Sequence, residues 1–210
     1  AFSFSRRTSI LDAVEDLIGP NILFFSSRFW IKPGREGSFV SWHPNSAYIG
    51  LKPNELVTVW LALTDSTIKN GCLRVIPRTH LGETYSHDET PDVKNLLARS
   101  QSIEEIDDSR AINLELKAGQ FSIHHERLVH GSLPNATDRP RIGLGLFCMP
   151  THVRSTLDRR FADLARGIDD FNYWDHDPTP ETASAEVVAG HVEKAGDRYV
   201  DPDFAQESAR

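Results

Sequence analysis

Short strand-like segments separated by turn signals constrain this chain more than any other feature of its sequence. Each segment is apolar or alternating in polarity, and Gly, Pro or Asn lies near most of the breaks between them. The segments are 21–25, 28–32, 57–63, 72–76, 121–124 and 141–148. Many short strands with helices outside them predict a mainly β fold with flanking helices, of the β-sandwich or jelly-roll type.

Helical patterns are fewer. Residues 9–18 place an apolar face on one side, made by Ile10, Leu11, Val14, Leu17 and Ile18. Segments 92–99 and 157–165 are weaker helix candidates. A long polar connection at 81–113 has the length of a lid or a binding loop.

The length and composition predict one domain with an ordinary core. The chain has 210 residues, 39% of them hydrophobic, and a formal net charge of -7. That charge disfavours nucleic acid as a partner, because phosphates are bound by clustered Lys and Arg. We see no run of about 20 apolar residues that would span a membrane, and no signal peptide. Cys72 and Cys148 are too few and too far apart for a disulfide framework, which favours a cytoplasmic location. The oligomeric state is not predicted.

Two histidines and an asparagine form a candidate metal site. His43 and Asn45 lie two residues apart, so in a strand both side chains face the same side. His130 follows 85 residues after Asn45, in a loop-like run just beyond a strand. Two imidazoles and one carboxylate on one face of an ion select Fe(II) and leave room for a cosubstrate and O₂.

Asn45 departs from that pattern, because its amide oxygen can coordinate a metal but brings no negative charge. Three interpretations stay open. Asn45 is a weak third ligand, it leaves the position to water or chloride, or it marks a loss of function. His124 and His125 are alternative ligands on opposite faces of a strand. If His130 points inward along an unbroken strand, His124 does too, and His125 and Glu126 lie at the surface.

Arg141 opens the last strong strand and is a candidate anion-binding residue. Its guanidinium forms a planar fork that pairs with both oxygens of a carboxylate, such as one end of a diacid that chelates the metal. Ser132 is a candidate second donor to that carboxylate, and Trp60 is a candidate wall of the pocket. The ordinary alternatives are a surface charge for Arg141, a turn residue for Ser132 and a core residue for Trp60.

Four segments, in order and spacing, resemble the phytanoyl-CoA dioxygenase family between about residues 17 and 153. They are the W-H-P-N run at 42–45, V-T-V-W-L-A-L at 57–63, N-G-C-L-R-V-I-P-R-T-H at 70–80, and H-G-S-L-P-N at 130–135 with R-P-R-I-G at 139–143. The family writes the first of these as W-H-x-D, so Asn45 stands where the family has aspartate. The family also has Gly-Ser where this chain has Arg78 and Thr79.

The resemblance implies a double-stranded β-helix, a cupin-like jelly roll, at residues 1–175. Residues 176–210 would be a C-terminal extension, partly helical at 187–195 or irregular, and the family's N-terminal helix and first strand would precede Ala1. It implies Fe(II) with 2-oxoglutarate as cosubstrate and O₂. The metal ligands would be His43 and His130 with Asn45 in the place of the aspartate, and Arg141, Ser132 and Trp60 would bind 2-oxoglutarate.

The expected activity is hydroxylation of a small molecule. The alternatives are a related halogenase, in which chloride takes the place of the acid, or a jelly roll that binds its ligand without turnover.

Overall fold

The structure of the chain is a computed structural model. It describes residues 2–176 except 83, 84, 87, 90, 98, 104 and 158–160. The predicted extension at 176–210, with its helix at 187–195, therefore lies outside the described residues, apart from residue 176.

Helices are few and strands are many. The helices are α1 (Phe2–Ser5), α2 (Thr8–Ile18) and α3 (Ser46–Ile49), with 3-10 turns η1 (Ile68–Asn70), η2 (Thr79–Leu81) and η3 (Asp108–Arg110). The strands are β1 (Ile22–Lys32), β2 (Val40–His43), β3 (Leu51–Lys52), β4 (Val57–Ala62), β5 (Leu73–Val75), β6 (Ile112–Leu114), β7 (Phe121–His125), β8 (His130–Ser132), β9 (Arg141–Pro150), β10 (Arg154–Ser155) and β11 (Asp163–Arg166).

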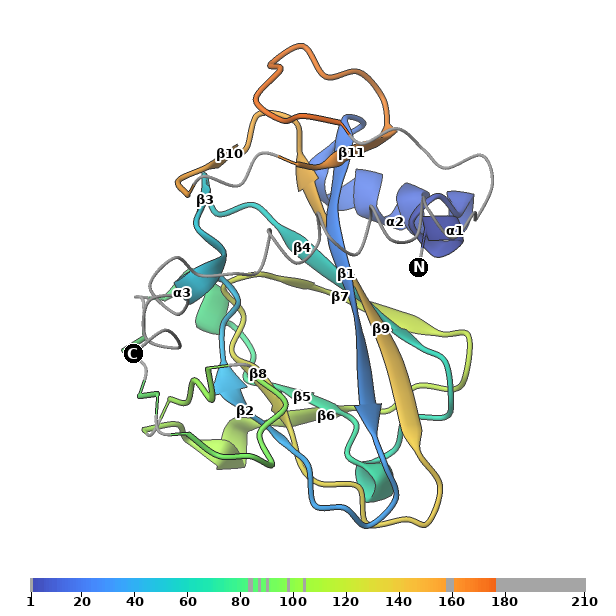
Figure 1. Cartoon of the computed structure of the whole chain (residues 1–210), viewed down its shortest axis with the longest axis vertical. Coiled ribbons are helices and arrows are strands. Elements are labelled where there is room, and N and C mark those ends of the chain that lie inside the picture. Colours follow the sequence, from blue (N-terminus) through green and yellow to red (C-terminus); the bar gives the residue numbers. More distant parts are fainter. Residues whose placement is uncertain are drawn as a thin grey trace, which may run out of the picture.

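Within the described residues, the strands form two main antiparallel sheets. One has the order β11-β1-β9-β4-β7, and the other has the order β2-β8-β5-β6. A small sheet pairs β10 with β3. Figure 1 shows the long strands β1 and β9 side by side, with β2, β8, β5 and β6 grouped beside them. This arrangement is the predicted jelly roll, and the site is built between the two main sheets.

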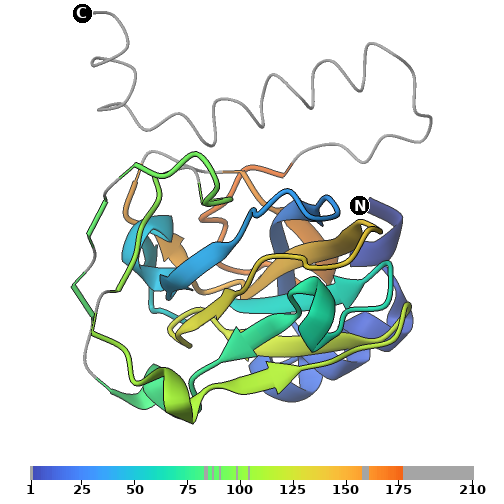
Figure 2. The ribbon, with the colours of Figure 1, turned by 90° about the horizontal axis from the view of Figure 1, so that it is seen from below.

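Strand β4 is buried on both faces, and its alternation explains why. Val57, Val59 and Leu61 pack with α2 in one core cluster. Trp60 and Ala62 pack in another cluster, toward Leu73 and Val75 of the second sheet. In Figure 2 helices α1 and α2 lie outside the strands, on the side of the molecule away from β2. One face of the five-stranded sheet therefore forms the core and the other is available for a pocket.

Helix α2 confirms the helix predicted at residues 9–18. Ile10, Leu11 and Val14 are buried against the sheet. Leu17, however, is 61% exposed, so its predicted place on the buried face is wrong. Ile18, the next residue, packs against the core cluster, so Leu17 alone of the five predicted residues faces solvent.

Strand β1 joins two of the predicted segments, 21–25 and 28–32, into one strand of 11 residues. Its pairing with β9 shifts register between Phe24 and Ser26. Beyond that shift the apolar side chains of Phe29 and Ile31 are half exposed, while Lys32 is fully buried. The strand therefore turns a cation inward and two large apolar residues outward.

Two helix predictions are wrong. Segment 92–99 has turns and bends, and Asn95 forms a bridge with Phe39. Segment 157–165 ends in strand β11, which adds to the edge of β1. In both segments backbone pairing with residues distant in sequence overrides a local preference for helix.

The long connection predicted at 81–113 packs along β2. Its Ile103 amide donates a hydrogen bond to the Trp42 carbonyl oxygen, and Leu97 and Ile103 are buried. It also contains η3 and the start of β6. A role as a lid stays a prediction.

Candidate active site

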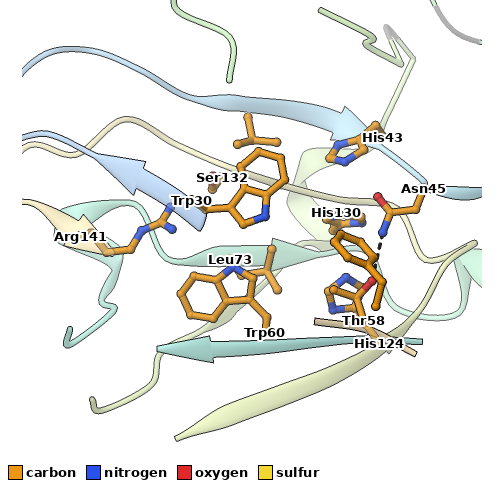
Figure 3. A pocket seen from close by; sticks show the side chains of 12 residues that line it. Trp30, His43, Asn45, Thr58, Trp60, Leu73, His124, His130, Ser132 and Arg141 are labelled. Atoms are coloured by element: carbon orange, nitrogen blue, oxygen red, sulfur yellow. Dashed lines mark hydrogen bonds between the residues drawn. The ribbon is translucent and has the colours of Figure 1, made fainter. Parts of the chain in front are cut away.

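A pocket lies between the two main sheets. Polar groups converge in it from β2, β4, β7, β8 and β9 (Figure 3). It is lined by Trp30, Val40, His43, Asn45, Thr58, Trp60, Leu73, His124, His130, Ser132, Arg141 and Phe147. All six residues that the sequence predicted for the site are in this set.

His43 and His130 point toward each other. They are direct partners in the β2–β8 ladder, and their ring centroids are 4.2 Å apart. Two imidazoles bound at right angles to one ion, at a metal–nitrogen distance of about 2.1 Å, place their centroids roughly 4.6 Å apart. The observed spacing therefore suits two ligands of a single cation. His130 lies within a strand and not in the predicted loop.

Hydrogen bonds fix which nitrogen each ring presents. The Nδ1 atom of His43 lies 2.8 Å from the Ser41 carbonyl oxygen, and that of His130 lies 2.8 Å from the Leu128 carbonyl oxygen. A carbonyl only accepts, so Nδ1 carries the proton and Nε2 of the neutral ring carries the lone pair. Histidines that bind a metal through one ring nitrogen usually make such a hydrogen bond with the other.

Burial keeps the His130 ring neutral at neutral pH. His43 is 1% exposed and His130 is 7% exposed. Burial lowers the pKa of His130 to about 4, and the Leu128 carbonyl opposes that shift only in part. A neutral imidazole is the form that binds a metal, so this ring is ready to do so at neutral pH.

Asn45 lies in the pocket, but for a different reason than predicted. Strand β2 ends at His43, and Asn45 is the N-cap residue of α3 in a helical conformation. Its Nδ2 donates to the Thr58 hydroxyl over 3.2 Å. In Figure 3 the amide oxygen of Asn45 lies on the side of His43. The turn into α3, and not strand alternation, brings this side chain beside the two imidazoles.

His124 also faces the pocket, as predicted, but no unbroken strand links it to His130. Its ring centroid is 4.7 Å from that of His130, and neither ring nitrogen has a hydrogen-bond partner within the described part of the chain. Burial, then the neighbouring imidazoles of His130 and His125, lower its pKa well below the usual value. No group of three His, Cys, Asp or Glu side chains among the described residues is placed to hold a metal ion. His124 therefore does not complete a three-histidine set.

The two residues after His124, which are His125 and Glu126, differ in how deeply they are buried. His125 is half-buried and its Nδ1 accepts from the Arg127 amide. Glu126 was predicted at the surface, and that prediction is wrong, because its side chain is fully buried. Its Oε1 accepts from the Leu56 amide over 3.2 Å, and burial raises its pKa to about 7. Strand β7 ends at His125, so the alternation of side chains along a strand no longer predicts which way Glu126 faces.

Arg141 lies at the other end of the pocket and is 2% exposed. Its Nη2 donates to the Gly71 carbonyl oxygen over 2.8 Å, and its guanidinium lies 5.3 Å from the Trp60 ring centroid. Burial lowers its pKa to about 10, so it stays charged at neutral pH. Figure 3 shows Arg141 and the pair of histidines at opposite ends, with Trp60 and Ser132 between them. Arg141 is therefore not a surface charge, and Ser132 lies in strand β8 and not in a turn. Trp60 lines the pocket and is also a core residue, as its ordinary alternative expected.

Sequence reasoning missed Lys32, whose Nζ donates to the Ser132 hydroxyl over 2.6 Å. A signal was present, because Lys32 alternates with Trp30 in a strand, and a bulky aromatic marks the inward face. Phe29 and Ile31 alternate with these two residues and are also apolar, so the pattern did not show which face of the strand is buried.

Gly143 allows the Trp60 ring to lie against β9. A Cβ at Gly143 would lie 2.2 Å from a ring carbon of Trp60. We expect Gly143→Ala to lower the free energy of unfolding by about 1–3 kcal/mol, because neither backbone nor indole can move freely. Urea unfolding measures the change. The control is Gly82→Ala, whose Cβ meets its nearest atom at 3.6 Å. Equal stability of the two variants would contradict the close packing.

The fold is a double-stranded β-helix, and it is similar to that of the solved non-heme monooxygenase ThoJ. The metal-free ThoJ structure is 32% identical, has a TM-score of 0.80, and aligns with 92% of this chain and 71% of its own. A nickel complex of ThoJ aligns with a TM-score of 0.74 at 30% identity, over 92% of this chain and 72% of its own.

Residues 2–143 match the phytanoyl-CoA dioxygenase family, and the chain belongs to that family. A probable alpha-ketoglutarate-dependent hypophosphite dioxygenase of Stutzerimonas stutzeri is 30% identical over 135 residues, which cover 63% of this chain and 47% of that protein. The human peroxisomal phytanoyl-CoA dioxygenase is 30% identical over 141 residues, covering 65% and 42%. The aligned part thus spans less than half the length of these two relatives. Among the described residues, no helix is long and apolar enough to cross a bilayer.

Proposed function

We propose that the chain is a non-haem Fe(II)- and 2-oxoglutarate-dependent oxygenase that hydroxylates a small molecule. One observation carries the proposal: two imidazoles converge at one end of a buried pocket, and a buried guanidinium lies at the other end. A 2-oxo diacid fits this arrangement. Its 2-oxo acid group would chelate a metal held by the imidazoles, and its second carboxylate would pair with the guanidinium. The relation to an alpha-ketoglutarate-dependent dioxygenase supports this choice of cosubstrate.

The residues of the chain hold, orient and shield the reactants. His43 and His130 would hold Fe(II) through Nε2, with the amide oxygen of Asn45 as a weak third donor. Arg141 and Ser132 would bind the C5 carboxylate of 2-oxoglutarate, and Trp60 would form the wall along its carbon chain. The apolar walls exclude water, which strengthens each of these charge interactions.

When bound, Fe(II) supplies the redox chemistry by which O₂ and 2-oxoglutarate give succinate and CO₂ while one oxygen atom enters a C–H bond of the substrate. That substrate is a small molecule in this proposal. A cytoplasmic location belongs to the proposal too, because Cys72 and Cys148 are buried, free thiols.

The position of Asn45 favours oxygenation over halogenation. A halide ligand needs an empty place beside the two histidines, and the Asn45 side chain fills that place at 5% exposure, tethered to Thr58. The neutral amide keeps a second candidate open, a jelly roll that binds 2-oxoglutarate without turnover. That candidate predicts diacid binding with weak metal binding and no succinate.

Calorimetry with Mn(II), followed by 2-oxoglutarate, tests the proposal. We expect one Mn(II) per chain, and we expect 2-oxoglutarate to bind more tightly once the metal is present. Succinate formation with Fe(II) and O₂ then separates an oxygenase from a binding protein. Absence of metal binding at the wild-type pocket would contradict the proposal.

Replacement of Asn45 by aspartate is expected to tighten metal binding on the order of tenfold, because a carboxylate adds a negative charge beside the divalent ion. Thr58 can donate its hydroxyl to the new carboxylate, so the side chain keeps its anchor. Mn(II) titration measures the affinity, and succinate release should rise with it. The control is Asn113→Asp, which adds the same charge at an exposed asparagine of β6 outside the pocket. If Asn45→Asp binds Mn(II) no better than the parent, Asn45 is not a ligand.

A further inference from the structure

Lys32 is a buried cation that the proposed function does not use. It ends β1, its side chain is 0% exposed, and it does not line the pocket. Its Nζ donates to the Ser132 hydroxyl over 2.6 Å and to the Leu133 carbonyl oxygen. Both acceptors are neutral. Burying an ammonium without an anion costs free energy, so we expect a functional role that offsets this cost.

A second buried cation lies directly opposite. Lys32 pairs with Arg141 in the β1–β9 ladder, so both side chains leave the sheet on the same face. Like charges at such a position repel. Within the described part of the chain, no carboxylate forms an ion pair with either residue. Burial first, and then the charge of Arg141, lower the pKa of Lys32 to about 7.

The hydrogen bonds show where an anion would fit. Because Ser132 Oγ accepts from Lys32, its own hydroxyl hydrogen has to point elsewhere, and Ser132 lines the pocket. The Nε atom of Arg141 is buried and has no hydrogen-bond partner among the described residues. Two donors and two positive charges thus meet at this end of the pocket.

We propose that Lys32 is a positioning residue of the carboxylate end, which fixes the Ser132 hydroxyl as a donor and adds a second positive charge that selects 2-oxo diacids over 2-oxo monoacids. The inference rests on the proposed function. It extends that function by naming what sets the preference for a diacid. Lys32 acts through Ser132 and through the field of its charge, since Ser132 lies between it and the pocket.

The test compares two acids of equal chain length, 2-oxoglutarate and 2-oxopentanoate, which lacks the C5 carboxylate. Each is titrated into the Mn(II)-loaded wild type and Lys32→Met, a change that keeps the length of the side chain and removes its charge. We expect Lys32→Met to weaken 2-oxoglutarate binding about tenfold or more and to leave 2-oxopentanoate within about twofold. A merely structural role would weaken both acids equally, and that result would overturn the inference.

A second readout is the pH dependence of 2-oxoglutarate binding. Above pH 7 the ligand-free Lys32 loses its proton, and binding of the diacid has to restore it, so the wild-type affinity falls as pH rises. The groups that face Lys32 are Arg141, which stays charged here, and the Cys72 thiol, whose pKa is raised by burial. We expect the affinity of Lys32→Met to be flat over the same range. Parallel profiles for both proteins would overturn the inference.

Failure of the two proposals can be told apart. A wild-type chain that binds Mn(II) but shows no 2-oxoglutarate binding overturns both. Tight binding of 2-oxoglutarate that is unchanged in Lys32→Met overturns only the role of Lys32. Thermal unfolding in the absence of ligand checks the fold of the variant, and we expect no loss of stability, because the change removes repulsion with Arg141.

Discussion

Loss of the His130 imidazole is expected to weaken divalent metal binding by at least about 100-fold. Changes to groups that only support a metal ligand already cost about 10- to 100-fold in affinity, and His130 would itself be one of the two imidazoles that hold the metal in the proposal. The ring is held in place by its bond to the Leu128 carbonyl, and the neighbouring His124 ring, 4.7 Å away, belongs to no three-ligand group among the described residues. Calorimetric titration of His130→Ala with Mn(II) measures the loss.

The matched control is His125→Ala, since His125 is a nearby histidine outside the pocket lining. Its ring lies 5.8 Å from that of His80 and is directed away from the metal ligands. We expect this variant to bind Mn(II) as the wild type does. If His125→Ala loses the metal and His130→Ala keeps it, the assignment of the two ligands is wrong.

The strands could be predicted because their signals are local. Alternation in 57–63 and the apolar run in 141–148 both place the correct residues on β4 and β9. The helices predicted at 92–99 and 157–165 were wrong, because Asn95 and β11 pair with chain that is distant in sequence. A pairing partner that is distant in sequence cannot be recognised from a short stretch of neighbouring residues.

The site was predicted more fully than the details that support it. Motif order brought His43, His130 and Arg141 together although 87 and 98 residues separate the first from the others. Asn45 was expected beside His43 because of strand alternation. It lies there because the turn into α3 follows β2 directly. Lys32 and Glu126 were missed, since burial of a charged side chain depends on the whole fold and is uncommon.

Removal of the Arg141 guanidinium is expected to weaken 2-oxoglutarate binding by at least about 100-fold while leaving Mn(II) binding nearly unchanged. Loss of one partner of a buried charged contact typically costs 2–5 kcal/mol, and the distant carboxylate of the diacid would keep only Ser132 as a direct partner. Arg141 and the histidines lie at opposite ends of the pocket, so the two effects should separate.

Titration of Arg141→Leu with 2-oxoglutarate and Mn(II) measures both affinities. The control is Arg139→Leu, an exposed arginine two residues earlier, which should change neither. The Lys32 ammonium remains in Arg141→Leu, and without its cationic neighbour its pKa should rise toward the ordinary value, since the charge of Arg141 is one cause of its lowering. Residual 2-oxoglutarate binding by Arg141→Leu should therefore depend less on pH near neutrality than binding by the wild type. Equal losses of metal and diacid would instead indicate a damaged fold and would remove the support for Arg141 as the carboxylate anchor.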